Sequence, residues 1–168
     1  MRDTRAFPDR EAGRILSSLR RDGRVREMKS FTQHGSVSTF EHCRAVTKLS
    51  LGIDRRLHLN SDKKVLITGA MLHDYFLYDW HDKARPGQRI HGYTHAAAAA
   101  KNARRHFDID GRTHHVIWSH MWPLNITRLP RSREAWIVCT ADKIVSLRET
   151  FMTRGKAKKR RGERSSGR

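Results

Sequence analysis

Apolar side chains recur at intervals of three and four residues along most of this chain, which is the spacing of one face of an α-helix. The pattern is clearest where His42, Val46, Leu49, Ile53 and Leu57 follow one another. No segment shows the sustained alternation of a half-buried strand, and no Asn-Gly turn separates two apolar runs. The sequence therefore predicts an all-α fold in which these five side chains share one buried helix face.

Capping and breaking residues divide this pattern into about six helices. Ser, Thr and Asp favour the position before a helix, whereas Gly and Pro end one. On these signals we expect helices over residues 9–21, 38–59, 62–85, 94–107, 113–120 and 132–151. The third helix is expected to carry His73 and Asp74 in its last turns and to end before Pro86.

The net charge of +18 is concentrated at the two ends of the chain. Residues 154–168 hold eight basic residues, one acidic residue and no apolar side chain larger than alanine. Such a segment cannot join a core, so we expect a disordered basic tail after a folded domain of residues 31–153. Residues 1–30 are expected to be a basic segment with one short helix. Each end is either an ordinary solvated terminus or a weak, non-specific contact for nucleic acid.

The apolar content favours a cytoplasmic protein without membrane contact. No stretch approaches the roughly 18 to 20 apolar residues of a membrane helix. The first ten residues are charged and are not followed by the apolar core of a secretory signal. Cys43 and Cys139 are expected to be reduced and buried as small packing residues.

Histidine is frequent, with 11 in 168 residues, and His42 and His73 lie on apolar faces of predicted helices. A single buried histidine is usually a core residue satisfied by a hydrogen bond. Asp74 changes that interpretation, because a carboxylate among apolar neighbours needs a cation to be buried. Imidazole and carboxylate are also the side chains that bind divalent transition metals, so a metal site is expected here.

Three short elements follow one another along the chain, namely Glu41-His42-Cys43, Leu72-His73-Asp74 and Ala141-Asp142-Lys143. Two further histidines, His95 and His120, stand between the second element and the third. This order resembles the HD superfamily of metal-dependent phosphohydrolases, and the added histidine pair resembles the two-metal branch of that family. The resemblance covers about residues 34–151 and implies an HD-domain helical bundle.

The resemblance implies two metal ions, the first held by His42, His73, Asp74 and Asp142 and the second by Asp74, His95 and His120. Asp74 would bridge the ions and orient the attacking water. This ligand set favours iron, manganese, cobalt or nickel over a structural zinc. The implied reaction is hydrolysis of a phosphoester or phosphoanhydride bond in a small phosphorylated metabolite or a nucleotide.

One position departs from the family pattern. Many members have a lysine four residues after the metal-binding histidine, where this chain has Leu77. A contact to phosphate must then come from another cation. The candidates are Lys101, Arg105, Arg128, Arg131, Arg133 and Lys143. Each of them is otherwise an ordinary solvated charge.

The segment 75–95 is rich in aromatic and ionisable side chains and is expected to overhang the metal site. Asp79 or His81 is a candidate proton donor to the leaving group. Trp80 or Tyr93 is a candidate surface for stacking a base. The alternative is a connecting loop that its own aromatic side chains hold in place.

Two other functions are compatible with this sequence. Some HD-type proteins use a similar six-ligand set in a mixed-valent diiron oxygenase, for which a bound iron pair and consumption of dioxygen would be diagnostic. A non-catalytic nucleic-acid-binding module would rely on the basic ends alone. A salt-sensitive affinity that survives removal of metal would indicate that module.

Overall fold

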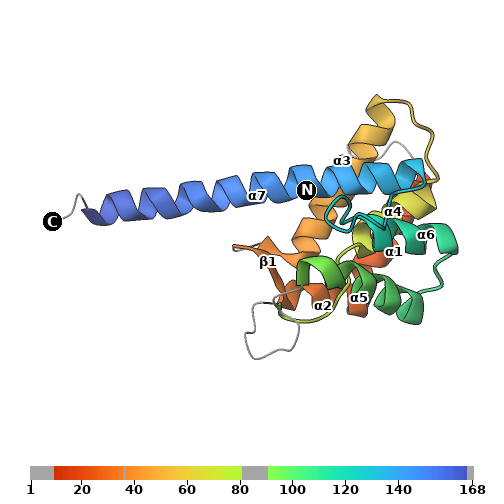
Figure 1. Cartoon of the computed structure of the whole chain (residues 1–168), viewed down its shortest axis with the longest axis horizontal. Coiled ribbons are helices and arrows are strands. Elements are labelled where there is room, and N and C mark those ends of the chain that lie inside the picture. Colours follow the sequence, from red (N-terminus) through yellow and green to blue (C-terminus); the bar gives the residue numbers. More distant parts are fainter. Residues whose placement is uncertain (1–9, 36, 81–90, 166–168) are drawn as a thin grey trace.

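The computed structural model describes residues 10–35, 37–80 and 91–165, with side chains described as far as Thr153 except that of His34. Helices make up most of this part of the chain (Figure 1). In chain order the elements are α1 (Arg10–Arg21), α2 (Gly23–Glu27), the 3-10 helix η2 (Met28–Ser30), β1 (Thr32–His34), β2 (Val37–Ser38), α3 (Thr39–Arg56), α4 (Lys63–Leu72), α5 (His91–His106), α6 (Gly111–Ser119) and α7 (Arg133–Ser165). The prediction of an all-α bundle is confirmed.

The helix starts follow the capping residues. The side chains of Ser38, Asp62 and Asp110 accept hydrogen bonds from backbone amides three residues later, at the starts of α3, α4 and α6. The small antiparallel hairpin of β1 and β2, with Thr32 opposite Ser38, was not predicted. Its strands are too short to show an alternating pattern in the sequence.

The helix α4 ends earlier than predicted. It stops at Leu72 instead of continuing toward Pro86, so His73 and Asp74 lie in the turn that follows it. The backbone of Leu77 has a φ of 56°, which a continuing helix does not allow. The carbonyls of the two residues before it accept hydrogen bonds from the side-chain amide of Asn102 on α5. The end of the predicted helix, residues 81–85, lies outside the described residues.

Two clusters of buried apolar residues form the core, and α4 contributes to both of them, through Met71 and Leu72 in one and Leu66 and Ala70 in the other. The first cluster also includes residues of α1, α2 and η2, namely Ala12, Leu16, Val25 and Met28. The described part of the segment 1–30 therefore packs on the same core as the helices after it. Both cysteines are free and buried, as expected.

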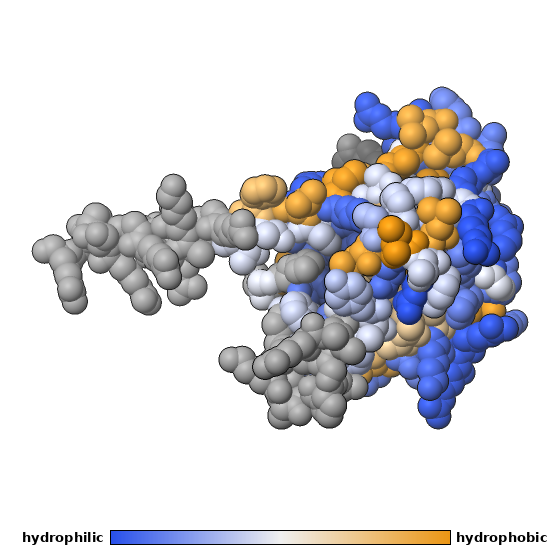
Figure 2. Space-filling model, in the orientation of Figure 1, coloured by the Kyte–Doolittle hydropathy of each residue, from blue (hydrophilic) through white to orange (hydrophobic). Residues whose placement is uncertain are grey.

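The helix α7 crosses the bundle and then extends beyond it (Figure 1). It continues as far as Ser165, so the structure differs from the disorder predicted for residues 154–168; residues 166–168 lie outside the described part. Lysine, arginine and alanine have high helix propensity and here extend a helix that is already formed. Exposed apolar side chains, including Ile144, Leu147 and Phe151, line α7 where it leaves the body (Figure 2). Within the described residues, no helix is both long and apolar enough to cross a membrane.

Candidate metal centre

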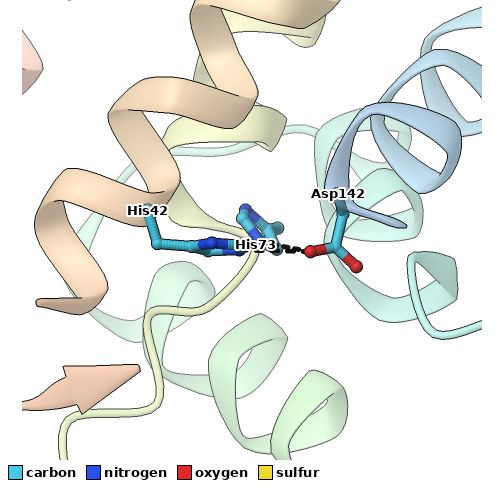
Figure 3. A group of neighbouring side chains, drawn as sticks. All are labelled: His42, His73 and Asp142. Carbon is cyan, nitrogen blue, oxygen red and sulfur yellow. Dashed lines mark hydrogen bonds and ion pairs between the residues drawn. The ribbon is translucent and has the colours of Figure 1, made fainter. Parts of the chain in front are cut away.

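The six histidines and aspartates of the predicted site converge on one buried region from five parts of the fold. His42 is on α3, His73 and Asp74 follow α4, His95 is on α5, His120 follows α6 and Asp142 is on α7. Their exposed fractions are 7% or less. Figure 3 shows His42, His73 and Asp142 directed toward one another from three different elements.

Helix ends and one glycine bring two of these imidazoles together. His73 and His120 each occupy the C-cap position of a helix, α4 and α6 respectively. The two helices approach closely because Gly69 has no side chain, and a Cβ at this position would lie 2.6 Å from a methyl carbon of Val116. The ring centroids of His73 and His120 are consequently 4.9 Å apart.

All four imidazoles have the same orientation, with Nδ1 held by an acceptor and Nε2 directed at the centre. The Nδ1 atoms of His73, His95 and His120 donate to carbonyl oxygens three or four residues earlier, at 2.8, 2.8 and 2.7 Å. The Nδ1 atom of His42 instead donates to the carboxylate of Glu149 on α7, at 3.0 Å. A bonded Nδ1–H leaves the Nε2 lone pair free to bind a metal.

Asp74 lies between two pairs of imidazoles, and each of its oxygens faces one pair. Its Oδ2 atom is 3.8 Å from His42 Nε2 and 3.4 Å from His73 Nε2. Its Oδ1 atom is 3.2 Å from His95 Nε2 and 3.5 Å from His120 Nε2. These separations are close to those of neighbouring ligand atoms on one ion, which are about 3 Å when each bond is about 2.1 Å long.

The helix α7 adds a second carboxylate to one side of the site. Asp142 Oδ1 lies 3.1 Å from His42 Nε2 and 3.7 Å from His73 Nε2. By distance, His42, His73 and Asp142 form one group that could hold an ion, and His73, Asp74 and His120 form another. His73 thus belongs to both groups. Its assignment to the first ion remains a prediction.

Some buried polar atoms in this region are incompletely hydrogen-bonded. Asp74 Oδ1 and His73 Nε2 are buried and make no hydrogen bond within the described residues. His95 Nε2 and His120 Nε2 face each other at 3.1 Å, although both rings already donate through Nδ1. Two lone pairs at this distance repel unless a proton or a metal ion lies between them. The site therefore fits bound cations.

Burial and the neighbouring charges shift the pKa values of these groups in different directions. Burial works to lower the pKa of His42, but hydrogen bonds to Asp142 and Glu149 outweigh burial and raise this pKa to about 10. Burial works to raise the pKa of Asp74, but the neighbouring charges of His73 and His95 hold it well below its usual range. Burial lowers the pKa of His120, so this imidazole stays neutral most readily. A cation binding here would displace protons from the more basic rings.

Sequence reasoning missed two residues that contact the ligands. The buried side-chain amide of Gln33 on β1 donates to Asp74 Oδ2 at 2.6 Å, and its carbonyl oxygen accepts from Thr39 at 3.3 Å. Glu149 contacts His42, as described above. Glu149 lies seven residues after Asp142, on the same face of α7, and this spacing is visible in the sequence. Nothing in the sequence indicates Gln33, because the unpredicted hairpin places it.

Aromatic side chains cover the side of His95. The rings of Trp80 and His91 stack at 5.0 Å, and those of His91 and His95 stack at 4.6 Å. Trp80 Nε1 also donates to the carbonyl of Thr32, which connects this stack to β1. Asp79 is exposed, as is Tyr93, whereas His81 lies outside the described residues.

The six cations predicted to contact phosphate have different surroundings. Lys101, Arg105 and Arg131 are exposed. Arg128 lies over the ring of Trp118, at 4.9 Å from its centroid. The guanidinium of Arg133 donates to the carbonyls of Leu59 and Asn60, and Lys143 Nζ donates to the carbonyl of His120 at 3.1 Å. Their roles toward substrate remain predictions.

Comparison with known proteins gives one result. A family model described as the HD domain matches residues 39–147, a span that includes all six converging residues. No curated protein and no solved structure matches the chain.

Proposed function

The chain belongs to the HD domain family, whose members are generally metal-dependent hydrolases. From this premise we propose that it hydrolyses a phosphoester or phosphoanhydride bond in a small phosphorylated metabolite or a nucleotide. We further propose that it does so with two divalent transition-metal ions. His42, His73, Asp74 and Asp142 would hold the first ion, and Asp74, His95 and His120 the second.

The position of Asp74 is the observation that carries this proposal. Its carboxylate is buried and reaches a pair of imidazole nitrogens through each oxygen. Within the described residues, its ion-pair partners are all histidines, with no lysine or arginine among them. A carboxylate in this setting would suit a ligand shared by two cations, because imidazole partners can exchange a proton for a metal ion, whereas lysine and arginine cannot.

The chain's own residues would bind, orient and exclude water. The backbone carbonyls and Glu149 fix the direction of each imidazole. Gln33 fixes Asp74 by donating to Oδ2, and burial of the ligands keeps bulk water from competing for them. Bound ions would supply a water nucleophile that is acidic at neutral pH and would neutralise charge on the phosphoryl oxygens. Asp79 and His81 remain the candidates for protonating the leaving group.

The test is a substrate panel on protein that has been stripped of metal and reloaded with Mn²⁺, Co²⁺ or Fe²⁺. Phosphomonoesters, nucleoside triphosphates and cyclic nucleotides are offered, and products are separated by chromatography. Wild type and Asp54→Asn, a matched buried aspartate outside the cluster, should release product, whereas Asp74→Asn should not. If protein with two bound ions hydrolyses no substrate of the panel and its iron form consumes oxygen, the protein would instead be an oxygenase.

A further inference from the structure

Among the four converging imidazoles, His42 is held differently from the rest. The other three donate Nδ1–H to neutral backbone carbonyls of their own segment. Two of them, His73 and His120, stand at helix C-termini, where carbonyls lack amide partners and are free to accept. His42 stands in the first turns of α3, after the N-cap Ser38, and bonds instead to a charged side chain of another helix.

That side chain, Glu149, lies on α7 two helical turns beyond Asp142. Asp142 Oδ1 faces Nε2 of His42 at 3.1 Å, and Glu149 Oε2 faces Nδ1 at 3.0 Å. The imidazole ring is completely buried and lies between these two carboxylates of a single helix, with the side chain of Glu149 only 12% exposed. The packing of α3 against α7 therefore sets the orientation of this ring.

A carboxylate differs from a carbonyl in what it does to imidazole. Both fix the ring with Nε2 free, but a negative charge at Nδ1–H also increases the electron density at Nε2 and strengthens its bond to a cation. We propose that Glu149 is a positioning residue that directs His42 Nε2 at the first metal ion and makes His42 the strongest imidazole donor of the site. This inference rests on the metal centre proposed above.

Three substitutions separate this role from ordinary packing. Glu149→Met removes the acceptor and keeps a long unbranched side chain that suits a helix. Glu149→Gln keeps an acceptor oxygen and removes the charge. Glu41→Gln is the matched control, because Glu41 precedes His42 in α3 but pairs with the exposed Arg44 at 2.7 Å. Far-UV circular dichroism establishes that each variant is folded.

The experiment titrates metal-free protein with Co²⁺ and records calorimetry together with proton NMR in H₂O and D₂O. High-spin Co²⁺ shifts the ring N–H protons of bound histidines out of the diamagnetic range, and these signals disappear in D₂O. Wild type and Glu41→Gln should give four such signals. Glu149→Met should lose one signal and bind the first ion, the one that His42 holds, about 10- to 100-fold more weakly. This is the usual cost of losing a side chain that orients a ligand. Glu149→Gln should keep four signals and show a smaller loss of affinity.

Two results would overturn the inference in distinguishable ways. Four shifted signals and unchanged affinity in Glu149→Met would show that Glu149 does not position His42, and the metal centre itself would stand. Absence of shifted signals in wild-type protein with saturating Co²⁺ would refute the metal centre and the role of Glu149 together.

Discussion

Two pairs of buried carboxylates in this molecule are neutralised by different means. Asp54 on α3 and Glu134 on α7 are 3% and 2% exposed, and each has a permanent cation, since Lys63 bonds to Asp54 and Arg112 lies 3.3 Å from Glu134. Asp74 and Asp142 are also buried, at 2% and 7% exposed, but within the described residues their ionic partners are all imidazoles.

The two pairs differ in whether their cationic partner can exchange a proton for a metal ion. Lysine and arginine keep their protons at any physiological pH, so the pairs of Asp54 and Glu134 are fixed parts of the fold. Imidazole can release its proton and offer a lone pair to a metal ion. The imidazole-rich pair is the one suited to bind cations, and four predictions test the contrast.

Loss of the bridging carboxylate should have the largest effect. Asp74→Ala should lose both ions and reduce turnover by about 1000-fold or more, because each oxygen serves a different imidazole pair. His120→Ala should keep one ion, since it affects only the side of Oδ1. Metal analysis of the dialysed proteins measures both outcomes, and an Asp74→Ala protein that retains two ions would contradict the bridging role.

Removal of metal should lower the free energy of unfolding, because only the carboxylates with imidazole partners would lose a bound cation. At ion concentrations 100- to 1000-fold above Kd, binding adds about 3 to 4 kcal/mol to the free energy of unfolding. Urea unfolding with and without a chelator measures this difference. An unfolding curve that a chelator leaves unchanged in metal-loaded protein would mean that the cluster is satisfied by protons alone.

Loss of a permanently paired carboxylate should affect stability alone. Asp54→Ala leaves the ammonium of Lys63 and the amide of Ser61 without their acceptor, and it should lower the free energy of unfolding by about 2 kcal/mol. The number of bound ions should equal that of wild type. A change in bound metal would show that the two regions are coupled and would weaken the comparison.

The stability contributions of the two regions should also respond to opposite ends of the pH scale. The pKa of His42 is raised from 6.5 to about 10, so in metal-free protein its contribution is complete below pH 6.5 and is lost as pH rises through 10. Burial works to raise the pKa of Asp54, but Lys63 and Ser61 outweigh it and lower this pKa, so its contribution is present above 3.8 and is lost in acid.

Because a metal must displace the proton on His42, Co²⁺ affinity should rise by up to about tenfold per pH unit between pH 7 and 10. Calorimetric titration in buffers of different ionisation enthalpy measures the affinity and the number of protons released. An affinity that does not change over this range would contradict competition between metal and proton at this site.

The sequence predicted the existence of the main helices, because apolar spacing and caps such as Ser38 and Asp62 act locally. It did not predict the end of α4, which depends on a distant contact from Asn102. It also missed the packing of Val25 and Met28 into the core, since a short basic segment shows little periodicity.

The proposed ligands were named from their order along the chain, whereas their orientation required the structure. Gln33 and Asp74 are 41 residues apart and meet only because a hairpin lies beside the site. His42 and Glu149 are 107 residues apart, and their contact follows from the packing of α3 against α7. A helical pattern predicts which face is buried, but it does not predict which neighbour lies there.

The central claim, that six side chains hold two ions on either side of Asp74, is tested most directly by diffraction from crystals of Mn²⁺-loaded protein at the manganese absorption edge. The account predicts two anomalous peaks about 3.5 to 4 Å apart. One peak should lie among His42, His73 and Asp142, the other should lie between His95 and His120, and each should be bound by one oxygen of Asp74. A single peak, or two peaks that do not share Asp74, would contradict it.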